Sequence, residues 1–154
     1  MMEVLLYLYE HYLCREITVA GDAITKELVL AGFKQQEILR AYRWLDTLYA
    51  ELEKYQALPQ EFQQLTRILT PEEIYTLGDE CYRFLLKLHC AGLLSTQARE
   101  LLIDRAVALS SQQLSLKQFK WIALLVLCLV ADSHVSIEAL ENFILNEDTK
   151  QTLH

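Results

Sequence analysis

The sequence predicts an all-α protein, a compact bundle of about seven helices. Apolar residues recur at helical spacings of three and four along most of its 154 residues, and no segment shows clear strand alternation. Only four glycines and two prolines are available for turns. Because 53% of the residues are hydrophobic, the chain can bury a substantial core, which excludes a disordered or low-complexity protein. No motif repeats at a period of roughly 20–50 residues, so solenoid proteins are excluded as well.

The corner between the second and third helices is the best-defined local feature. Gly32 follows a short apolar-periodic run and lies where a left-handed residue ends a helix. Phe33 is expected to fill the gap between the two helices. An apolar stripe then starts at once, at spacings of four and three: Ile38, Tyr42, Leu45, Tyr49 and Leu52. Neighbouring apolar residues widen this stripe, namely Ala41, Trp44 and Leu48.

Start and stop signals define the other helices. Thr70 is followed by a proline at the first helical position and by Glu73, and the two residues form a predicted capping box. Ser115 and Gln118 make a second capping box. Gly92 is expected to end the fourth helix, which should run to it without a break. The expected helices cover residues 2–14, 23–31, 34–56, 71–91, 96–109, 116–131 and 137–145.

The helices are expected to form two halves that share one core. Residues 1–56 make an N-terminal helical subdomain, and residues 70–154 make a C-terminal one. Residues 57–69 form the linker between them, because Pro59 and a run of polar residues interrupt the periodicity. Within the second half, residues 116–131 are apolar on nearly every face and should form the central helix.

Charge and apolar length limit the kinds of protein that the chain can be. The formal net charge of −7 is spread over both halves, which argues against a free-standing nucleic-acid binder, because neutralising phosphates supplies most of such affinity. The acidic start at residues 1–3 leads directly into a patterned helix, so no signal or transit peptide is expected. The longest apolar run, residues 121–131, is too short to cross a bilayer. We therefore expect a soluble cytoplasmic protein.

No arrangement of residues in the sequence predicts an active site, a metal or a cofactor. The phosphate-binding glycine motifs and the Gly-x-Ser-x-Gly nucleophile motif are absent. The four cysteines have no Cys-x-x-Cys spacing and are expected to be reduced core residues. A mixed zinc site is an alternative if the first and fourth helices pack together. Its ligands would come from His11, Cys14, Cys81, His89 and Cys90.

The candidate interaction surface is the solvent side of the third helix together with the residue before it: Lys34, Arg40 and Arg43. Cations at the front of a helix are typical of helix–turn–helix proteins that read DNA. Glu37 and Asp46, however, are spaced to pair with the two arginines at i,i+3 positions. The eight tyrosines supply further anchors for a protein interface, where tyrosine is enriched.

Several segments, taken in order along the chain, resemble the bacterial Smg family. They are Val4 to Glu10, the Ala31-Gly32-Phe33 corner with Glu37-Ile38 and Trp44-Leu45, Arg67 to Glu73, Leu116-Lys117, Lys120-Trp121, and the ending Leu153-His154. The resemblance implies a small cytoplasmic bacterial protein of a family of unknown function, and it carries over no catalytic residue. It also implies a link to DNA processing and initiator-methionine deformylation, since the family's genes often lie near genes for these processes.

Taken together, these features predict a non-enzymatic bacterial protein that acts as a protein–protein interaction or adaptor factor, with a protein partner. One alternative is an accessory factor of nucleic-acid processing or translation, which would bind DNA or RNA weakly or through a partner. The second alternative is an enzyme or metal protein whose site the sequence does not reveal.

Overall fold

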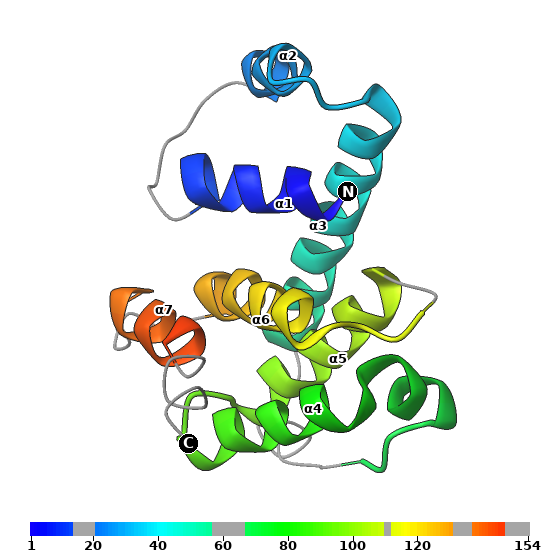
Figure 1. Cartoon of the computed structure of the whole chain (residues 1–154), viewed down its shortest axis with the longest axis vertical. Coiled ribbons are helices and arrows are strands. Elements are labelled where there is room, and N and C mark those ends of the chain that lie inside the picture. The colour runs from blue at the N-terminus through cyan, green and yellow to red at the C-terminus, as the bar shows by residue number, and fades with distance from the viewer. Residues whose placement is uncertain (14–20, 57–66, 110–111, 131–136, 147–154) are drawn as a thin grey trace. The chain divides into compact units, whose positions relative to one another are not determined.

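The computed structural model describes residues 1–13, 21–56, 67–109, 112–130 and 137–146, and these residues form helices and short connections with no strand. The elements are α1 (Met2–Leu8), the π-helical turn η1 (Tyr9–Leu13), α2 (Gly21–Leu30), α3 (Gln35–Gln56), α4 (Pro71–Cys90), α5 (Thr96–Leu109), α6 (Leu116–Val130) and α7 (Ile137–Leu145) (Figure 1). The predicted all-α class is confirmed. None of the described helices is both long enough and apolar enough to span a membrane.

The chain divides into two compact units, Met1–Ala50 and Glu51–His154, and the boundary falls inside α3. We call them unit 1 and unit 2. The predicted linker, residues 57–69, lies outside the described residues except for its last three positions, so the division into halves at that segment stays a prediction.

Unit 1 contains α1, η1, α2 and the first part of α3. The predicted first helix, residues 2–14, is helical from Met2 to Leu13, and Cys14 lies outside the described residues; a π-turn replaces the α-helix from Tyr9 onward. Tyr7 and Tyr12 are five positions apart, which is about 140° around an α-helix. A π-turn has i→i+5 hydrogen bonds, so residues five positions apart lie on nearly the same side of the helix. Both tyrosines thereby reach the carboxylate of Glu27 on α2.

The corner after α2 has the predicted geometry. Gly32 has φ 94°, in the left-handed region, and the N–H of Phe33 donates to the carbonyl of Leu28 at 3.1 Å. Phe33 is half-buried and meets the ring of Tyr7 edge to face, with ring centroids 5.7 Å apart. One position of the predicted stripe on α3 was wrong, because Tyr49 is 44% exposed. Most of the other predicted positions are buried, as expected: Ile38, Ala41, Trp44, Leu45, Leu48 and Leu52.

Unit 2 is organised around α6. This helix contacts α4, α5 and α7, and it lies between α5 and α7 (Figure 1). Its side chains are buried at Phe119, at Lys120 and at every position from Ile122 to Leu127. The prediction that this segment forms the central helix is confirmed for the described residues.

Local signals place the ends of the helices in unit 2. At the start of α4, the N–H of Glu73 donates to Thr70 Oγ1 at 3.3 Å, and the N–H of Thr70 donates to Glu73 Oε2 at 2.7 Å. Ser115 and Gln118 exchange the equivalent hydrogen bonds at 3.1 and 3.2 Å before α6. Gly92 follows α4 with φ 72°. Both predicted capping boxes and the predicted stop are confirmed.

Candidate functional site

A break in the middle of α4 is the main feature that sequence analysis missed. Gly78 has φ 64° and ψ 175°, so α4 is two helical segments joined at this residue and not the unbroken helix that was predicted. This backbone region is open to glycine almost alone. A Cβ at position 78 would also lie 2.1 Å from Gln113 Nε2, which leaves no room for a side chain unless Gln113 moves.

The loop that precedes α6 packs into this break. The N–H of Leu114 donates to the carbonyl of Thr76 at 2.8 Å, and Cys81 Sγ donates to the carbonyl of Leu114 at 3.7 Å. Thr76, Cys81 and Leu114 are all buried. Burial, with a smaller contribution from the charge of Glu80, raises the pKa of the Cys81 thiol to about 11. The loop therefore binds a backbone carbonyl beside the break and keeps the nearby thiol protonated.

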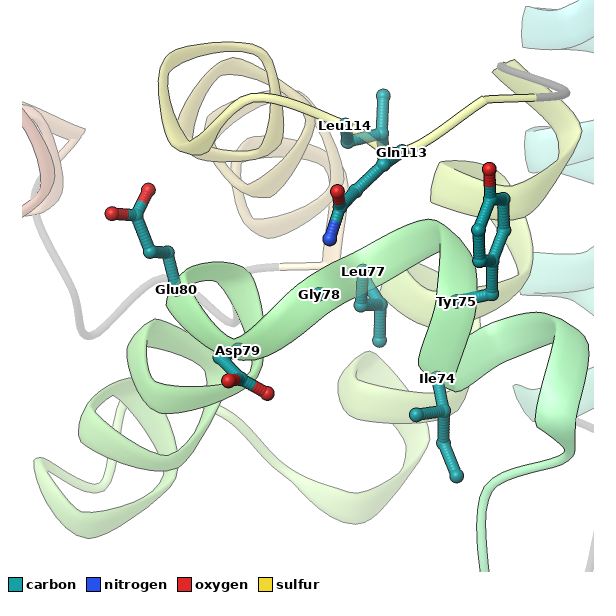
Figure 2. Close-up of a pocket in the computed structure, with 8 residues that line it drawn as sticks. All are labelled: Ile74, Tyr75, Leu77, Gly78, Asp79, Glu80, Gln113 and Leu114. Carbon is teal, nitrogen blue, oxygen red and sulfur yellow. The ribbon is translucent and has the colours of Figure 1, made fainter.

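Two hollows lie against the break. The first has a volume of about 450 Å³ and the second about 440 Å³. They share Ile74, Leu77, Gly78 and Asp79, so they adjoin each other across the α4 break, and we call the pair the α4 groove. Figure 2 shows the residues that line the first hollow. Gln113 points toward the α4 ribbon near Gly78, and the side chains of Asp79 and Glu80 leave α4 in different directions.

Large apolar side chains stand exposed along the α4 groove. The exposed fraction is 92% for Ile68, 57% for Ile74, 65% for Tyr75 and 41% for Tyr82. Beneath them Leu77 is buried and forms part of the lining of both hollows. Clustered exposed apolar groups of this kind mark interaction surfaces on a protein more often than isolated ones do.

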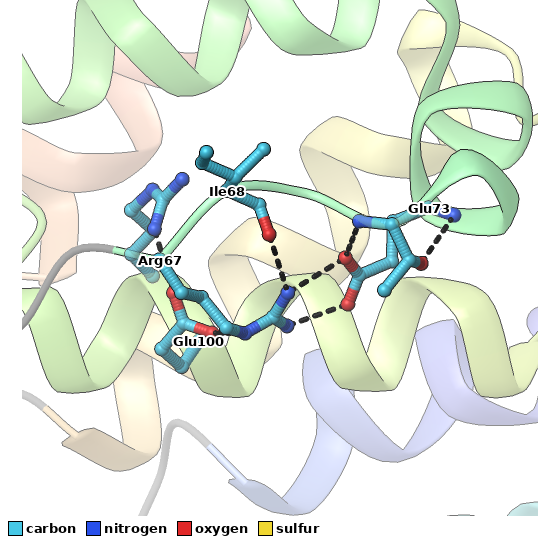
Figure 3. Close-up of polar contacts among 6 residues, drawn as sticks. Arg67, Ile68, Glu73 and Glu100 are labelled. Atoms are coloured by element: carbon cyan, nitrogen blue, oxygen red, sulfur yellow. Dashed lines mark hydrogen bonds and ion pairs between the residues drawn. The ribbon is translucent and has the colours of Figure 1, made fainter.

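A network of two arginines and two glutamates lies at one end of the α4 groove (Figure 3). Arg67 donates through Nη1 and Nη2 to the carboxylate of Glu73 at 2.7 and 2.5 Å, and its Nε lies 2.6 Å from Glu100 Oε2. Arg99 Nη1 lies 2.6 Å from the other oxygen of Glu100. The hydrogen bonds from Arg67 lower the pKa of Glu73 to about 2, and they raise the pKa of Arg67. The two positive charges are thus balanced within the network.

Unit 1 has a separate polar cluster around Glu27. Tyr7 Oη donates to Glu27 Oε1 at 2.7 Å, and Tyr12 Oη donates to Glu27 Oε2. These hydrogen bonds lower the pKa of Glu27 and raise the pKa of Tyr12 to about 12. The ring of His11 stacks on Tyr7 with centroids 4.1 Å apart. The two hydrogen bonds connect α2 to α1 and η1, and the ring stacking connects η1 to α1.

The predicted interaction surface is exposed at all three positions, Lys34, Arg40 and Arg43. Lys34 lies in the turn before α3, and the two arginines are one helical turn apart. The predicted pairing with Glu37 and Asp46 was wrong: among the described residues no ion pair joins either arginine to these carboxylates. Glu37 Oε1 instead lies 3.7 Å from the amino group of Met1.

The three residues of α4 considered for a mixed zinc site differ in their surroundings. Cys81 is buried on α4, whereas His89 and Cys90 are exposed at its end. Cys14 lies outside the described residues, and His11 contacts Tyr7. Within the described ranges no three histidine, cysteine, aspartate or glutamate side chains are grouped closely enough to hold a metal ion.

Comparisons with known proteins decide the family. A family model described as "Protein of unknown function (DUF494)" matches residues 1–154. The chain is 38% identical to Protein Smg homolog of Shewanella sp. (strain ANA-3), over 100% of this chain and 99% of that protein. It is 39% identical to Protein Smg homolog of Methylococcus capsulatus, over 92% and 90%. The chain belongs to the Smg family. No solved structure matches it significantly.

Membership of the Smg family confirms the resemblance drawn from the sequence, but the α4 groove of this Smg-family chain was not predicted. The available signal was Gly78 itself, a glycine inside an apolar-periodic helix and followed directly by two acidic residues. Such a glycine often marks a special backbone conformation, and acidic residues after it suit the start of a new helical segment. Nothing in the local sequence points to Gln113, which lies far along the chain.

Proposed function

We propose that this Smg-family protein is a non-enzymatic interaction factor of the bacterial cytoplasm, which binds a protein partner through the α4 groove. The observation that carries the proposal is the cluster of exposed apolar side chains on that groove. Ile68 at 92% and Tyr75 at 65% exposure stand beside hollows that end on the buried Leu77. Water in contact with this cluster is released when a partner covers it, which stabilises a complex.

The shape and composition of the α4 groove suit a protein segment. Each hollow has about the volume at the lower end of the range for binding sites, roughly 300–1,000 Å³, which is enough to receive one or two anchoring side chains. Tyr75 and Tyr82 add aromatic contact area with a polar tip, the kind of residue that dominates the energy of protein interfaces.

The chemistry of the nearest nucleophile supports a non-enzymatic role. The Cys81 thiol is buried, donates to the carbonyl of Leu114 and has its pKa raised to about 11. A thiolate, not a thiol, is the reactive form of cysteine, so Cys81 is inert at neutral pH. His11 Nδ1 lies 2.9 Å from the backbone carbonyl oxygen of Tyr7, and a carbonyl is not a nucleophile that a histidine activates.

Affinity purification at native expression, followed by mass spectrometry, tests the proposal. The chain with Ile68→Ser and Tyr75→Ser should lose a stoichiometric protein partner that the unchanged chain recovers. A matched control carries Val29→Ser and Leu30→Ser, which remove exposed apolar side chains of 52% and 87% exposure from unit 1, and it should keep the partner. Recovery of no stoichiometric partner, or equal recovery by the α4 groove variant, would contradict the proposal.

A nucleic-acid accessory role is a second candidate, because Arg40 and Arg43 are exposed without the intrahelical ion pairs expected for them in the described residues. The test is binding to short DNA and RNA duplexes over a range of salt. Arg40→Ala with Arg43→Ala should lower the salt slope by about one for each phosphate contact that is lost. Lys26→Ala with Lys117→Ala, at two other exposed cations, is the control. Binding that is undetectable or independent of salt removes this candidate.

A further inference from the structure

The charges along the α4 groove indicate which kind of protein segment fits it. We infer that the α4 groove binds a short basic segment, with a Lys or Arg side chain at the first hollow and an aliphatic side chain in the second. This inference rests on the proposed function and adds the chemistry of the partner.

The first hollow is acidic. Its lining includes the carboxylates of Asp79 and Glu80 and contains no lysine, arginine or histidine. Both side chains are exposed, and among the described residues neither takes part in an ion pair with a basic group. Gln113 adds an amide oxygen that can accept a hydrogen bond from a cation. A cationic side chain at this hollow would therefore lie near a carboxylate, Asp79 or Glu80, which leave α4 in different directions, and near an acceptor.

The second hollow is largely apolar, and its one carboxylate is Asp79, which it shares with the first hollow. Ile68, Ile74 and Tyr82 line it together with the buried Leu77. Its two arginines, Arg67 and Arg99, are the only basic groups in its lining, and both are held by the glutamates of the network described above. An aliphatic side chain in this hollow gains from burial without displacing a charge from its partner.

The other exposed charges along α4 include both signs. Glu72 is a further exposed carboxylate at the start of α4, and Arg83 is the exposed cation that follows Tyr82 on the same helix. The exposed carboxylates of α4 are thus Glu72, Asp79 and Glu80, and its exposed lysine and arginine residues are Lys87 and Arg83. Asp79 and Glu80 also begin the second segment of α4, where acidic residues complement the helix dipole. This role explains their type, and it leaves their carboxylates open to a cationic partner.

Selection of random peptides displayed on phage against the whole chain tests the inference. The enriched peptides should combine an aliphatic residue with nearby lysine or arginine. Fluorescence anisotropy of labelled enriched peptides should then show binding about tenfold weaker for Asp79→Asn with Glu80→Gln, within the range for two screened charge contacts. The control, Glu3→Gln with Glu10→Gln, removes two exposed carboxylates of unit 1 and should change affinity by less than about twofold.

Salt gives a measurement on the unchanged chain, independent of whether the variants fold. Raising salt from about 0.05 M to about 0.5 M should weaken the enriched peptides by a similar factor, because exposed charge contacts are screened. Enrichment of acidic or uncharged peptides, no enrichment, or affinity that ignores both Asp79→Asn/Glu80→Gln and salt would overturn the inference. Sedimentation that shows self-association abolished by Ile68→Ser would overturn it in favour of a second copy of the chain.

Failure of the basic segment can be distinguished from failure of the proposed function. A natural partner that is lost with Ile68→Ser and Tyr75→Ser, but kept with Asp79→Asn and Glu80→Gln, leaves the proposed function intact and refutes the basic segment. A partner kept by both variants refutes the groove as a binding surface altogether.

Discussion

Replacing Gly78 by alanine tests the break in α4 and, with it, the α4 groove. Two effects oppose the native geometry in the variant. The backbone angles of φ 64° and ψ 175° are poorly accessible to alanine, and the new Cβ would lie 2.1 Å from Gln113 Nε2. The contacting nitrogen ends a flexible, exposed side chain that can move aside, so the backbone term is expected to be the larger one.

The size of the effect follows from three contributions. Holding alanine at these angles costs about 1–3 kcal/mol. Displacing the Gln113 side chain from its preferred rotamer adds about 0.5–1.5 kcal/mol. The smaller conformational freedom of alanine in the unfolded chain offsets about 0.4–1 kcal/mol. The net loss in the free energy of unfolding is about 2 kcal/mol, which lowers the Tm by about 4–8 °C for a chain of this length.

Thermal and denaturant unfolding followed by circular dichroism measure this loss. Gly21→Ala, in open space with ordinary backbone angles, is the matched control and should change stability by less than about 0.5 kcal/mol. Adding Gln113→Ala to Gly78→Ala should restore only the steric part, so most of the loss should persist. The backbone angles at position 78 would not require glycine if the Gly78→Ala chain were as stable as the original or were fully rescued by Gln113→Ala. Either result would refute the reasoning.

Three further outcomes are expected. Glu73→Gln keeps the cap but loses the ion pair with Arg67. Because the pKa of Glu73 is lowered to about 2, the original chain should lose about 1–2 kcal/mol of its free energy of unfolding as pH falls from about 4.5 to 2, and the variant should show a flatter acid unfolding profile. An unchanged profile counts against the network. Glu27→Gln should return the pKa of Tyr12 from about 12 toward 10 in a tyrosinate absorbance titration, because a neutral amide no longer favours the protonated phenol, and a titration still centred near 12 would exclude Glu27 as the cause. Iodoacetamide at pH 8 with mass spectrometry should modify the exposed Cys90 well before the buried Cys81, and equal rates would mean that the loop before α6 opens readily.

The ends of the helices could be predicted because their causes are local. Thr70 with Glu73, and Ser115 with Gln118, satisfy backbone groups within three residues of themselves, so the sequence contains all the partners. Gly32 similarly closes a turn with its immediate neighbours. The family could be predicted for a related reason, since short segments in a fixed order identify it without any knowledge of their contacts.

Errors arose where the geometry depends on distant partners. The stripe on α3 was placed with Tyr49 inside, because spacings of three and four fit two adjacent faces equally well and only packing chooses between them. The π-turn at Tyr9–Leu13 accompanies the contacts of Tyr7 and Tyr12 with Glu27, which lies on another helix. A single helical period does not contain this information.

The α4 groove shows the same limit at the level of function. Its apolar residues belong to α4 and the segment before it, and they read in the sequence as one continuous helix with a preceding extended piece. Both hollows adjoin the break at Gly78, and the first one also needs Gln113 and Leu114, which come from far along the chain. Lys34, Arg40 and Arg43, by contrast, could be nominated from charge alone, and their role stays a prediction.

The long span between the two sides of the groove affects when it appears during synthesis. Cys81 and Leu114, which meet beside the break, are separated by 33 positions, so α4 leaves the ribosome well before the loop that packs against it. Contacts across such a span form late relative to local helix formation. A partner that needs the first hollow would therefore find it complete only after the residues leading into α6 have been made, because Gln113 and Leu114 are part of its lining.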